Sequence, residues 1–347
     1  MDSLSAVSSS CPSQAAAIAQ RPGSLLTAAK PAPALSAADQ ALISLGRLLR
    51  DGGYDFTTTT PLSHRRVLAR KQHSKSLQEV FGWSRPFRRR DVPTDVWRYL
   101  DEAGALQPAG AQVRSTVRFS TLDGQIFVHS AFPTDEADAV FFGPDTYRFA
   151  RLVRQTLQTI NHSGPLRLLD LGAGSGAGGL HATTLLPGQM NVVLSDINGQ
   201  ALRYCRINAA LNAVDGVEVI ESDLFENVTG SFDVIIANPP YLVDARARTY
   251  RHGGGQFGEG LSLRIAAEGV GRLAPNGRLI LYTGTAIVAG EDRLHAALQA
   301  MFTDRSLRLS YEEIDPDVFG EELDHAPYDR ADRIAVVAAI FTRAGDR

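Results

Sequence analysis

The second half of the chain alternates short apolar runs with longer stretches in which apolar residues recur at helical spacing. The strand-like runs are residues 166–172, 191–196, 217–223, 232–240, 277–284, 308–314 and 333–342, and the clearest helical stretches are residues 199–213 and 260–273. Nearly continuous apolar strands that alternate with helices are typical of a parallel sheet covered by helices on both faces. We therefore predict an α/β fold for this half.

The first half has a different pattern. Residues 1–36 are rich in Ala, Ser and Pro without an apolar period, which predicts a disordered tail. Helical spacing begins after Ser36, a favourable N-terminal cap, and Gly52 and Gly53 end that helix. Further elements are predicted as helices at residues 61–72 and 91–106, the latter capped by Thr94, and as two strands at residues 113–131 around the turn Asp123-Gly124. The front region is thus predicted to be a helical unit closed by a hairpin.

Composition narrows the class of protein. The 347 residues leave room for about two domains, and no apolar run approaches the roughly 20 residues that span a bilayer. Cys11 and Cys205 lie far apart and lack metal-ligand spacing. This excludes a disulfide scaffold and a cysteine zinc site, predicts no metal, and fits a cytoplasmic location.

Charge is unevenly distributed along the chain. Residues 1–110 hold 14 Lys+Arg against 9 Asp+Glu, a net charge of +5, and the remainder holds 21 against 29, a net charge of −8. The stretches HRRVLARK (64–71) and RPFRRR (85–90) have the composition of a phosphate-binding surface, on which Trp83 and Phe87 would stack with bases. A solvated helix face explains the same arginines, so both interpretations stay open.

A glycine-rich turn, LLDLGAGSGAGG (168–179), follows the first strand of the second half. Glycines at such a turn let the backbone approach a ligand and lead into a helix whose N-terminal amides face the site. The residues Gly174, Gly176 and Gly179 also have the spacing of a dinucleotide site. A nicotinamide-dependent oxidoreductase is therefore an alternative from a different class.

Acidic residues end three consecutive predicted strands, and they favour another ligand. Asp170 lies two residues before Gly172, where it would repel a pyrophosphate but suit an ammonium group. Asp196 lies where an acid accepts hydrogen bonds from ribose hydroxyls. Asp223 would accept from an adenine amino group, with Ile197 and Leu224 covering the ring. S-adenosylmethionine is a ligand that has an ammonium group, a ribose and an adenine but no phosphate.

The fourth strand ends in Asn238-Pro239-Pro240-Tyr241. The prolines cannot extend a central strand, so they fix a rigid corner. The side-chain carbonyl of Asn238 and the backbone carbonyl of Pro239 can each accept an N–H from a planar amino group. This grip would aim the nitrogen lone pair at a methyl sulfonium, and the Tyr241 ring would stack on a flat substrate. Asn238 would orient the nitrogen rather than act as a general base.

In this order and spacing, LDLGAGSG, LSDIN, ESDLF and NPPY resemble the class I S-adenosylmethionine-dependent methyltransferases. The likeness is to the N-methyltransferase branch with the NPPY signature, which includes release-factor glutamine methyltransferases, adenine N6-methyltransferases and the "methyltransferase small" domain of ribosomal-RNA guanine methyltransferases. It implies a Rossmann-like sheet, mostly parallel with an antiparallel C-terminal strand. The resemblance covers roughly residues 139–342. Together with the pattern of the first half, it predicts a tail at 1–36, a substrate-recognition domain at 37–138 and a methyltransferase domain at 139–347.

The resemblance assigns roles to particular residues. It places the cofactor on Asp170, Gly172, Gly174, Asp196 and Asp223, and the amino-group grip on residues 238–241, with Asn238 also at the cofactor. The segment FFGPDTYRFARLV (141–153) resembles the Pro-Asp-Thr segment that borders the cofactor in the glutamine enzymes, which adds Asp145 and Thr146. A helix start capped by Asp145 is the alternative there.

The methyl acceptor stays open at this point. Gly143 and Tyr147 stand where the glutamine enzymes usually have Arg and Glu. A glycine-rich stretch at 248–260 is interpreted as a mobile lid in which Arg248, Arg251 and His252 contact the substrate, or as an ordinary flexible loop. A nucleic-acid base, a protein glutamine and a small heteroaromatic metabolite all present a suitable N–H group. A non-catalytic nucleic-acid-binding protein with this fold is a further alternative.

Overall fold

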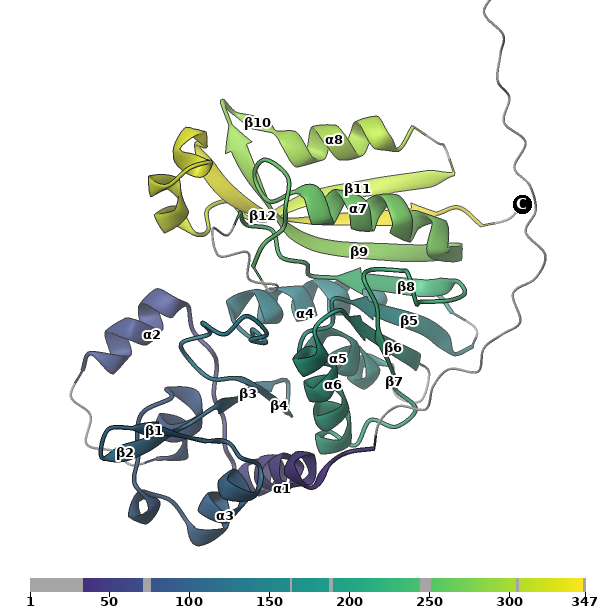
Figure 1. The fold of residues 1–347 in the computed structure, drawn as a ribbon. Coiled ribbons are helices and arrows are strands. Elements are labelled where there is room, and N and C mark those ends of the chain that lie inside the picture. The colour runs from purple at the N-terminus through teal and green to yellow at the C-terminus, as the bar shows by residue number, and fades with distance from the viewer. Residues whose placement is uncertain are drawn as a thin grey trace, which may run out of the picture. The chain divides into compact units, whose positions relative to one another are not determined.

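The computed structural model describes residues 34–70, 76–162, 164–186, 190–243, 251–303 and 306–345. Residues 34–347 form one compact unit (Figure 1). The predicted tail at residues 1–36 falls almost wholly outside the described residues. None of the helices in the described ranges is both long enough and apolar enough to cross a membrane.

One large sheet dominates the second half, and it confirms the predicted fold class. Its strands run in the order β11-β12-β9-β8-β5-β6-β7, with a short β10 beside β9. The pairings from β9 through β7 are parallel, whereas β12 is antiparallel to both β9 and β11. The bounds are β5 Leu166–Leu171, β6 Met190–Asp196, β7 Glu218–Glu221, β8 Phe232–Ala237, β9 Leu273–Val288, β10 Glu291–Asp292, β11 Leu307–Asp315 and β12 Arg333–Arg343.

Helices cover both faces of this sheet, as continuous apolar strands require. In β5, Leu168 packs in the cluster that contains α4, α5 and α6, whereas Leu169 packs in the cluster with α7 and α8. Neighbouring residues of one strand are therefore buried on opposite faces. The helices are α4 Pro144–Leu157, α5 Ala177–Leu185, α6 Gly199–Leu211, α7 Gly260–Gly269 and α8 Arg293–Met301, with short η3 Val270–Arg272, η4 Gly320–Asp324 and η5 Tyr328–Arg330.

The front region consists of short helices and two hairpins. The elements are α1 Ala37–Asp51, α2 Pro61–Leu68, η1 Gln78–Gly82, η2 Arg89–Asp91, α3 Thr94–Glu102, β1 Leu106–Ala109, β2 Gln112–Ser115, β3 Val117–Leu122 and β4 Gln125–Ser130. Ser36 caps α1 through a reciprocal pair with Asp39, as predicted. The β3–β4 hairpin around Asp123-Gly124 is confirmed, but β2 forms a separate hairpin with β1 that the sequence did not indicate.

Several boundaries in the front region differ from expectation. The helix predicted at residues 91–106 is shorter, since α3 ends at Glu102 and Leu106 already belongs to β1. Pro93 occupies the cap position of α3 and Thr94 is already the first helical residue, so Thr94 is not the cap. Helix α2 ends at Leu68, four residues before the predicted end, and residues 71–75 lie outside the described chain. Proline at the first position of α2 fits its fixed φ, and Thr60 caps that helix.

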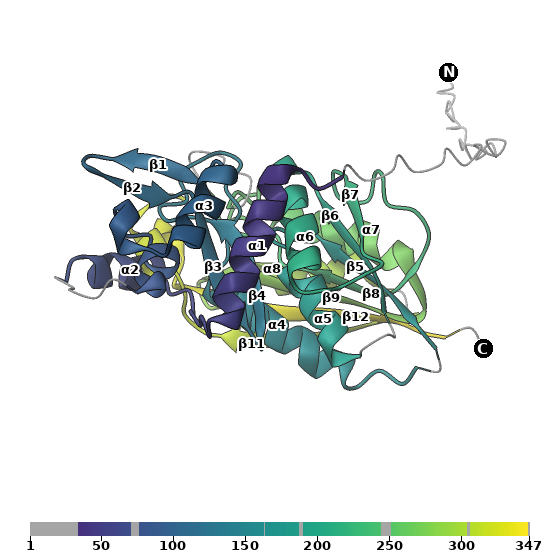
Figure 2. The ribbon, with the colours of Figure 1, turned by 90° about the horizontal axis from the view of Figure 1, so that it is seen from below.

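The front and back regions share a hydrophobic core. Helix α1 lies along α6 (Figure 2), and their residues pack in one cluster with β3 and β4. Asn208 of α6 is fully buried, and its side chain accepts from the Val128 amide at 2.8 Å and donates to the Val128 carbonyl at 3.0 Å. The hairpin is thus fixed to the sheet domain. The division near residue 138 stays a prediction.

Candidate functional site

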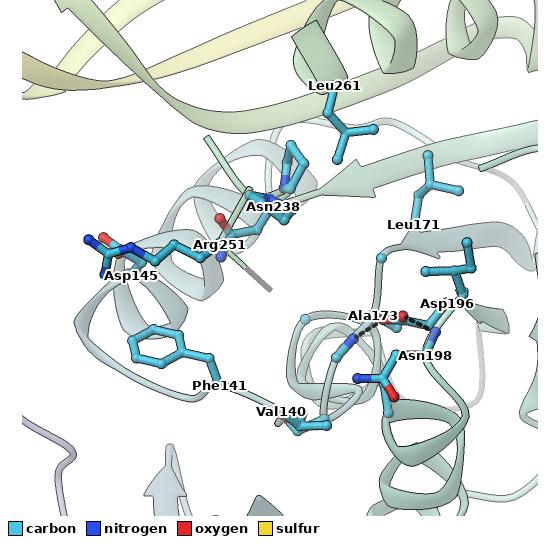
Figure 3. A pocket seen from close by; sticks show the side chains of 18 of the residues that line it. Val140, Phe141, Asp145, Leu171, Ala173, Asp196, Asn198, Asn238, Arg251 and Leu261 are labelled. Atoms are coloured by element: carbon cyan, nitrogen blue, oxygen red, sulfur yellow. Dashed lines mark hydrogen bonds between the residues drawn. The ribbon is translucent and has the colours of Figure 1, made fainter. Parts of the chain in front are cut away.

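A cavity of about 470 Å³ lies at the carboxyl ends of β5, β6 and β8. Open α/β sheets bind their ligands at this edge. Side chains from distant parts of the chain face it in Figure 3, among them Asp196 at the end of β6, Asn238 after β8 and Phe141 before α4. All thirteen residues predicted for the site line this cavity: Asp145, Thr146, Asp170, Gly172, Gly174, Asp196, Ile197, Asp223, Leu224, Asn238, Pro239, Pro240 and Tyr241.

The glycine turn forms a wall of bare backbone. Gly172, Gly174 and Gly176 have φ values of 70°, 57° and 76°, a conformation that side chains rarely adopt. A Cβ on Gly172 would meet no atom within 4 Å, so space for a ligand begins directly at its backbone. In contrast, a Cβ on Gly179 would lie 2.5 Å from the Leu194 side chain, so that glycine is required for packing α5 on β6.

Asp170 is 2% exposed at the end of β5. Its Oδ2 accepts a hydrogen bond from the Gly179 amide at 2.7 Å, which ties the strand to α5. Burial raises the pKa of Asp170 to about 7, with a further contribution from the nearby Asp196. A cationic group in the cavity would favour the ionised form of this carboxyl.

Asp196 fixes the glycine turn. Its two carboxylate oxygens accept from the amides of Gly174 at 2.8 Å and Asn198 at 2.9 Å. Burial raises the pKa of Asp196, and these amides oppose that shift. Each carboxylate oxygen can accept more than one hydrogen bond. Asp196 therefore combines a structural role with capacity to accept from a ligand in the cavity.

The third acid lies at a more open part of the rim. The Asp223 side chain is 44% exposed, and the nearest cation, Arg264, is 3.8 Å away. Ile197 is 55% exposed although it is large and apolar, and it lines the cavity together with Leu224. An exposed apolar side chain beside an acid suits a flat polar ring that is covered on its face and hydrogen-bonded at its edge.

The corner after β8 contributes Asn238 and Pro239 to the lining of the cavity. Within the described chain, neither the Asn238 side chain nor the Pro239 carbonyl takes part in a hydrogen bond, and both residues line the cavity. Pro239 is buried, whereas Asn238 and Pro240 are partly exposed. Because the prolines limit backbone rotation, the two acceptors are held in a fixed relation.

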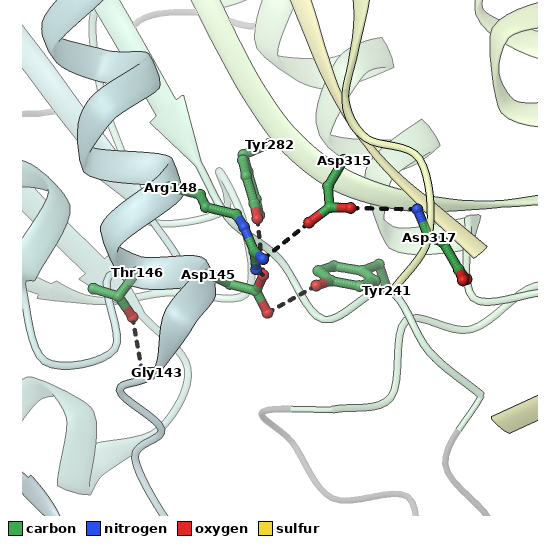
Figure 4. Close-up of polar contacts among 8 residues, drawn as sticks. All are labelled: Gly143, Asp145, Thr146, Arg148, Tyr241, Tyr282, Asp315 and Asp317. Carbon is green, nitrogen blue, oxygen red and sulfur yellow. Dashed lines mark hydrogen bonds and ion pairs between the residues drawn. The ribbon is translucent and has the colours of Figure 1, made fainter. Parts of the chain in front are cut away.

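Tyr241 is anchored by a buried carboxylate from another part of the chain (Figure 4). Its hydroxyl donates to Asp145 Oδ2 at 2.9 Å, while Tyr282 of β9 donates to Asp145 Oδ1 at 2.8 Å. Arg148 contacts the same Oδ1 at 3.3 Å and pairs with Asp315 at 2.9 Å. Burial raises the pKa of Tyr241 well above its usual value, so its hydroxyl stays a donor.

This network changes the interpretation of Asp145. The carboxylate is not the cap of α4, since Gly143 holds that position. Both carboxylate oxygens are engaged by tyrosine hydroxyls, so Asp145 positions the corner. Its predicted contact with the cofactor stays a prediction. Thr146 accepts from the Gly143 amide at 3.2 Å and so stabilises the start of α4.

The ring of Tyr241 is itself closely packed. It is 8% exposed, and a Cβ on Gly284 would lie 2.2 Å from it, so one side of the ring rests on the backbone of β9. Phe319 contacts it at a centroid distance of 6.0 Å. Stacking of Tyr241 on a substrate stays a prediction.

The described part of the glycine-rich segment packs against the corner, which does not fit a freely moving lid. Residues 244–250, including Arg248, lie outside the described chain. A Cβ on Gly253 would lie 2.6 Å from the Pro240 carbonyl, and one on Gly258 would lie 2.2 Å from the Tyr241 carbonyl. The Gly253 amide also donates to the Leu242 carbonyl at 2.8 Å. These glycines are needed for close backbone contact.

The predicted substrate contacts of this segment reach the cavity. Arg251 and His252 both line it, and Arg251 is hydrogen-bonded to Glu322.

The aromatic residues predicted to stack on bases are packed inside the front region. Phe87 is 3% exposed and cannot stack on a base. Trp83 is partly buried and contacts the rings of Phe56 and His64. The stacking expected of these two aromatics is wrong for Phe87, because its ring is buried in the front hydrophobic cluster and contacts Trp97.

Several cavity residues were not predicted from the sequence, namely Val140, Phe141, Ala173, Asn198, Leu261 and Phe319. Ala173, Asn198 and Phe141 lie within the stretches LDLGAGSG, LSDIN and FFGPDTYRFARLV, so the motifs themselves were the available signal for these three. The other three are apolar and lie outside these motifs. Asn198 caps α6 by accepting from the Gln200 amide at 2.9 Å.

The sheet order, the antiparallel β12 and the glycine turn after β5 form a Rossmann-like methyltransferase fold. The resemblance indicated by the motifs is confirmed by the match of residues 150–303 to the family model "Methyltransferase small domain".

Several methyltransferases are similar in sequence to part of this chain. A release factor glutamine methyltransferase of Deinococcus radiodurans is 32% identical over 158 residues, 43% of this chain and 55% of the relative. The enzyme of that name in Lactococcus lactis is 33% identical over 175 residues, 47% of this chain and 60% of the relative. The ribosomal RNA small subunit methyltransferase C of Serratia proteamaculans is 31% identical over 156 residues, 39% of this chain and 44% of the relative. The matched part thus spans little more than half of the first two relatives.

Proposed function

We propose that the chain is an S-adenosylmethionine-dependent N-methyltransferase that acts on a planar amide or exocyclic amino nitrogen. The observation that carries this proposal is the pair of acceptors at Asn238 and Pro239, two residues that line the cavity and whose acceptor oxygens have no hydrogen-bond partner in the described chain. They lie at the sheet edge that also holds the glycine turn and three acids. The similarity to glutamine and ribosomal-RNA methyltransferases supports this interpretation.

The residues present fit the proposed cofactor. Asp170 would hold its ammonium group, Asp196 its ribose hydroxyls, and Asp223 with Ile197 and Leu224 its adenine. The backbone at Gly172 leaves room for it, since a Cβ there would meet no atom within 4 Å. Buried carboxylates at the turn disfavour a pyrophosphate, which argues against a dinucleotide. When bound, this cofactor supplies an electrophilic methyl group.

The protein's own contribution is to position the acceptor nitrogen. Two carbonyl oxygens accept its N–H bonds and favour a pyramidal nitrogen with an aimed lone pair. Asp145 holds Tyr241 by a 2.9 Å hydrogen bond, and Pro239 and Pro240 restrict the backbone, so the corner is ordered before substrate binds. The nitrogen loses its proton after it gains the methyl group, so no strong base is required.

A nucleic-acid base and a protein glutamine both offer the required planar N–H group. Relatives named for each substrate support a macromolecular acceptor.

We further propose a cytoplasmic location, which the two widely separated cysteines favour. Cys205 is fully buried in α6, so it belongs to the core as expected.

The test is methyl transfer from labelled S-adenosylmethionine to fractions of a cell lysate, namely RNA, DNA, protein and small molecules. We expect label in a macromolecular fraction with the natural chain. Asn238→Ala should reduce transfer by about 10² or more, the scale for losing one transition-state hydrogen bond. Its affinity for S-adenosylhomocysteine should stay nearly unchanged. Equal loss of transfer and affinity would mean that the corner is only structural.

A further inference from the structure

A second feature next to the methyl-transfer cavity is a buried arginine without a counter-charge. Arg118 at the start of β3 is 4% exposed, and its Nε and Nη2 have no hydrogen-bond partner among the described residues. Its guanidinium lies 5.6 Å from the centre of the Phe56 ring. Burial lowers the pKa of Arg118 to about 10, so it remains charged at neutral pH. A buried charge of this kind is costly unless an anion or a hydrogen-bond acceptor meets it.

Among the described residues, the groups that interact electrostatically with Arg118 carry no negative charge. Those that interact with it electrostatically are Tyr54 and Tyr147, both neutral. Burial together with the Arg118 charge lowers the pKa of His64 to about 4 and that of His129 well below its usual value. Both histidines are therefore neutral at physiological pH, and they add neither a counter-ion nor a second cation.

A small cavity of about 20 Å³ adjoins this arginine. It is lined by hydroxyl-bearing and basic residues and by aromatic rings: Thr58, Thr59, Pro61, Arg118, His129, Ser130, Phe132, Thr134, Phe141 and Phe142. This set contains no carboxylate. The volume admits a single oxygen atom, since a water-sized probe needs roughly 10–15 Å³.

The small cavity and the methyl-transfer cavity share a wall. Pro61 at the start of α2 and Phe141 before α4 line both of them. These two side chains therefore form part of the boundary between the two cavities. Under the proposed function the methyl acceptor occupies the larger cavity, so a terminal oxygen of the acceptor would approach Arg118 at this boundary.

The surface beside this wall is strongly basic. Residues 57–90 contain 9 Lys+Arg and one acid, Glu79, which is paired with Arg85. Arg65 and Arg66 on α2 and Arg88 after it are exposed. Arg85 donates to the Val67 carbonyl at 2.9 Å, which joins the end of α2 to the segment that carries Arg88. Such a surface attracts the backbone of a nucleic acid.

From these observations we infer that Arg118 forms a subsite for a phosphate group of the methyl acceptor, which favours a nucleic acid over a protein glutamine. One phosphate oxygen would contact the guanidinium, and the hydroxyl of Thr58 or Ser130 would donate to the same group. The exposed arginines of residues 57–90 would hold neighbouring phosphates. This inference rests on the proposed function for the identity of the acceptor, but phosphate binding can be measured without methyl transfer.

The direct test compares the natural chain with Arg118→Met, which keeps an unbranched side chain and removes the charge. Thermal unfolding is followed during titration with inorganic phosphate, with sodium chloride at equal ionic strength as the reference. The matched control is Arg151→Met, an exposed arginine on α4. We expect phosphate to raise the unfolding temperature of the natural chain and of Arg151→Met. Arg118→Met should lose this response while its stability without phosphate is unchanged or higher, because an unpaired buried charge has been removed.

A second measurement separates the ligand classes. A short 5′-phosphorylated oligonucleotide and a glutamine-containing peptide, both without a reactive label, are titrated against each variant. Loss of oligonucleotide affinity in Arg118→Met by about tenfold, with unchanged affinity in Arg151→Met, supports the inference. A phosphate response that persists in Arg118→Met would overturn it, as would a marked loss of stability on removing the charge or tighter binding of the peptide than of the oligonucleotide.

The proposed function is tested separately in the same variants. Calorimetric titration with S-adenosylhomocysteine should give equal affinity in the natural chain and in Arg118→Met, since Arg118 does not line the methyl-transfer cavity. Absence of S-adenosylhomocysteine binding in both would count against the methyltransferase proposal alone. Normal S-adenosylhomocysteine binding without a phosphate response would count against the subsite alone.

Discussion

Two tyrosine hydroxyls donate hydrogen bonds to Asp145, and we expect the removal of each hydroxyl to affect stability and turnover differently. Tyr241→Phe and Tyr282→Phe each remove one hydroxyl that donates to this buried carboxylate, at 2.9 Å and 2.8 Å. Tyr241 belongs to the corner that lines the cavity, whereas Tyr282 does not line it. A comparison of the two variants therefore separates the contribution of a hydrogen bond to stability from its effect on the geometry of the site.

The expected losses of stability depend on which hydrogen-bond partners each Asp145 oxygen keeps after the substitution. Without the Tyr241 hydroxyl, Asp145 Oδ2 has no partner in the described chain. Without the Tyr282 hydroxyl, Oδ1 keeps Arg148 at 3.3 Å. Hydrogen bonds to charged groups contribute about 1.5–3 kcal/mol each. We expect Tyr241→Phe to lower the free energy of unfolding by the upper part of this range and Tyr282→Phe by the lower part, measured by urea denaturation.

Turnover should respond differently. Tyr241→Phe releases the ring that anchors the corner, so Asn238 and Pro239 lose their fixed position, and a displacement of about 1 Å can cost on the order of 10²-fold in rate. Tyr282→Phe should leave turnover within about threefold of the natural chain, a change of less than 1 kcal/mol in the barrier. Equal losses of turnover in both variants, or none in Tyr241→Phe, would refute a positioning role for the hydrogen bond to Tyr241.

Two further predictions concern the glycine turn and the segment that covers the corner. The folded-state pKa of Asp170 is raised to about 7 from a reference of 3.8, so its stabilising contribution is full below about pH 4 and is lost as the pH rises to about 7. Asp170→Asn should flatten the fall in unfolding free energy across this window, and an unchanged pH profile would contradict the burial argument. Gly258→Ala should reduce both stability and turnover, because a Cβ would lie 2.2 Å from the Tyr241 carbonyl and Gly258 has a φ of 92°. Gly254→Ala is the control for backbone strain, since Gly254 has a φ of 68° and a Cβ there would meet no atom within 4 Å. Equal effects of the two glycine substitutions would show that close packing on the corner is unimportant.

Local sequence pattern was sufficient to predict the sheet and its ligand-binding edge. Asp170, Asp196, Asp223 and Asn238 each follow or end a short apolar strand, and parallel strands bring such ends together. Their convergence on one cavity therefore required only the fold class and the glycine turn. Ser36 as the cap of α1 was predicted on similarly local grounds.

Contacts between distant segments could not be predicted in this way. Asp145 and Tyr241 are separated by 96 positions, and nothing in either motif indicates that the two side chains meet. The glycines at 253 and 258 suggested a mobile segment. The structure shows instead that glycine is needed at both positions because the backbone of an earlier segment lies in close contact with them. Arg118 lies in a strand of ordinary appearance, and only its burial reveals that its charge lacks a partner.

The central claim is that Asn238 and Pro239 hold a nitrogen in line with the methyl donor. A crystal structure with S-adenosylhomocysteine and a non-reacting acceptor tests this most directly. We expect the acceptor nitrogen within about 2.7–3.2 Å of the Asn238 and Pro239 carbonyl oxygens, with the sulfur of S-adenosylhomocysteine facing that nitrogen from the side of Asp170. An acceptor bound elsewhere, or a sulfur directed away from Asn238, would contradict the account.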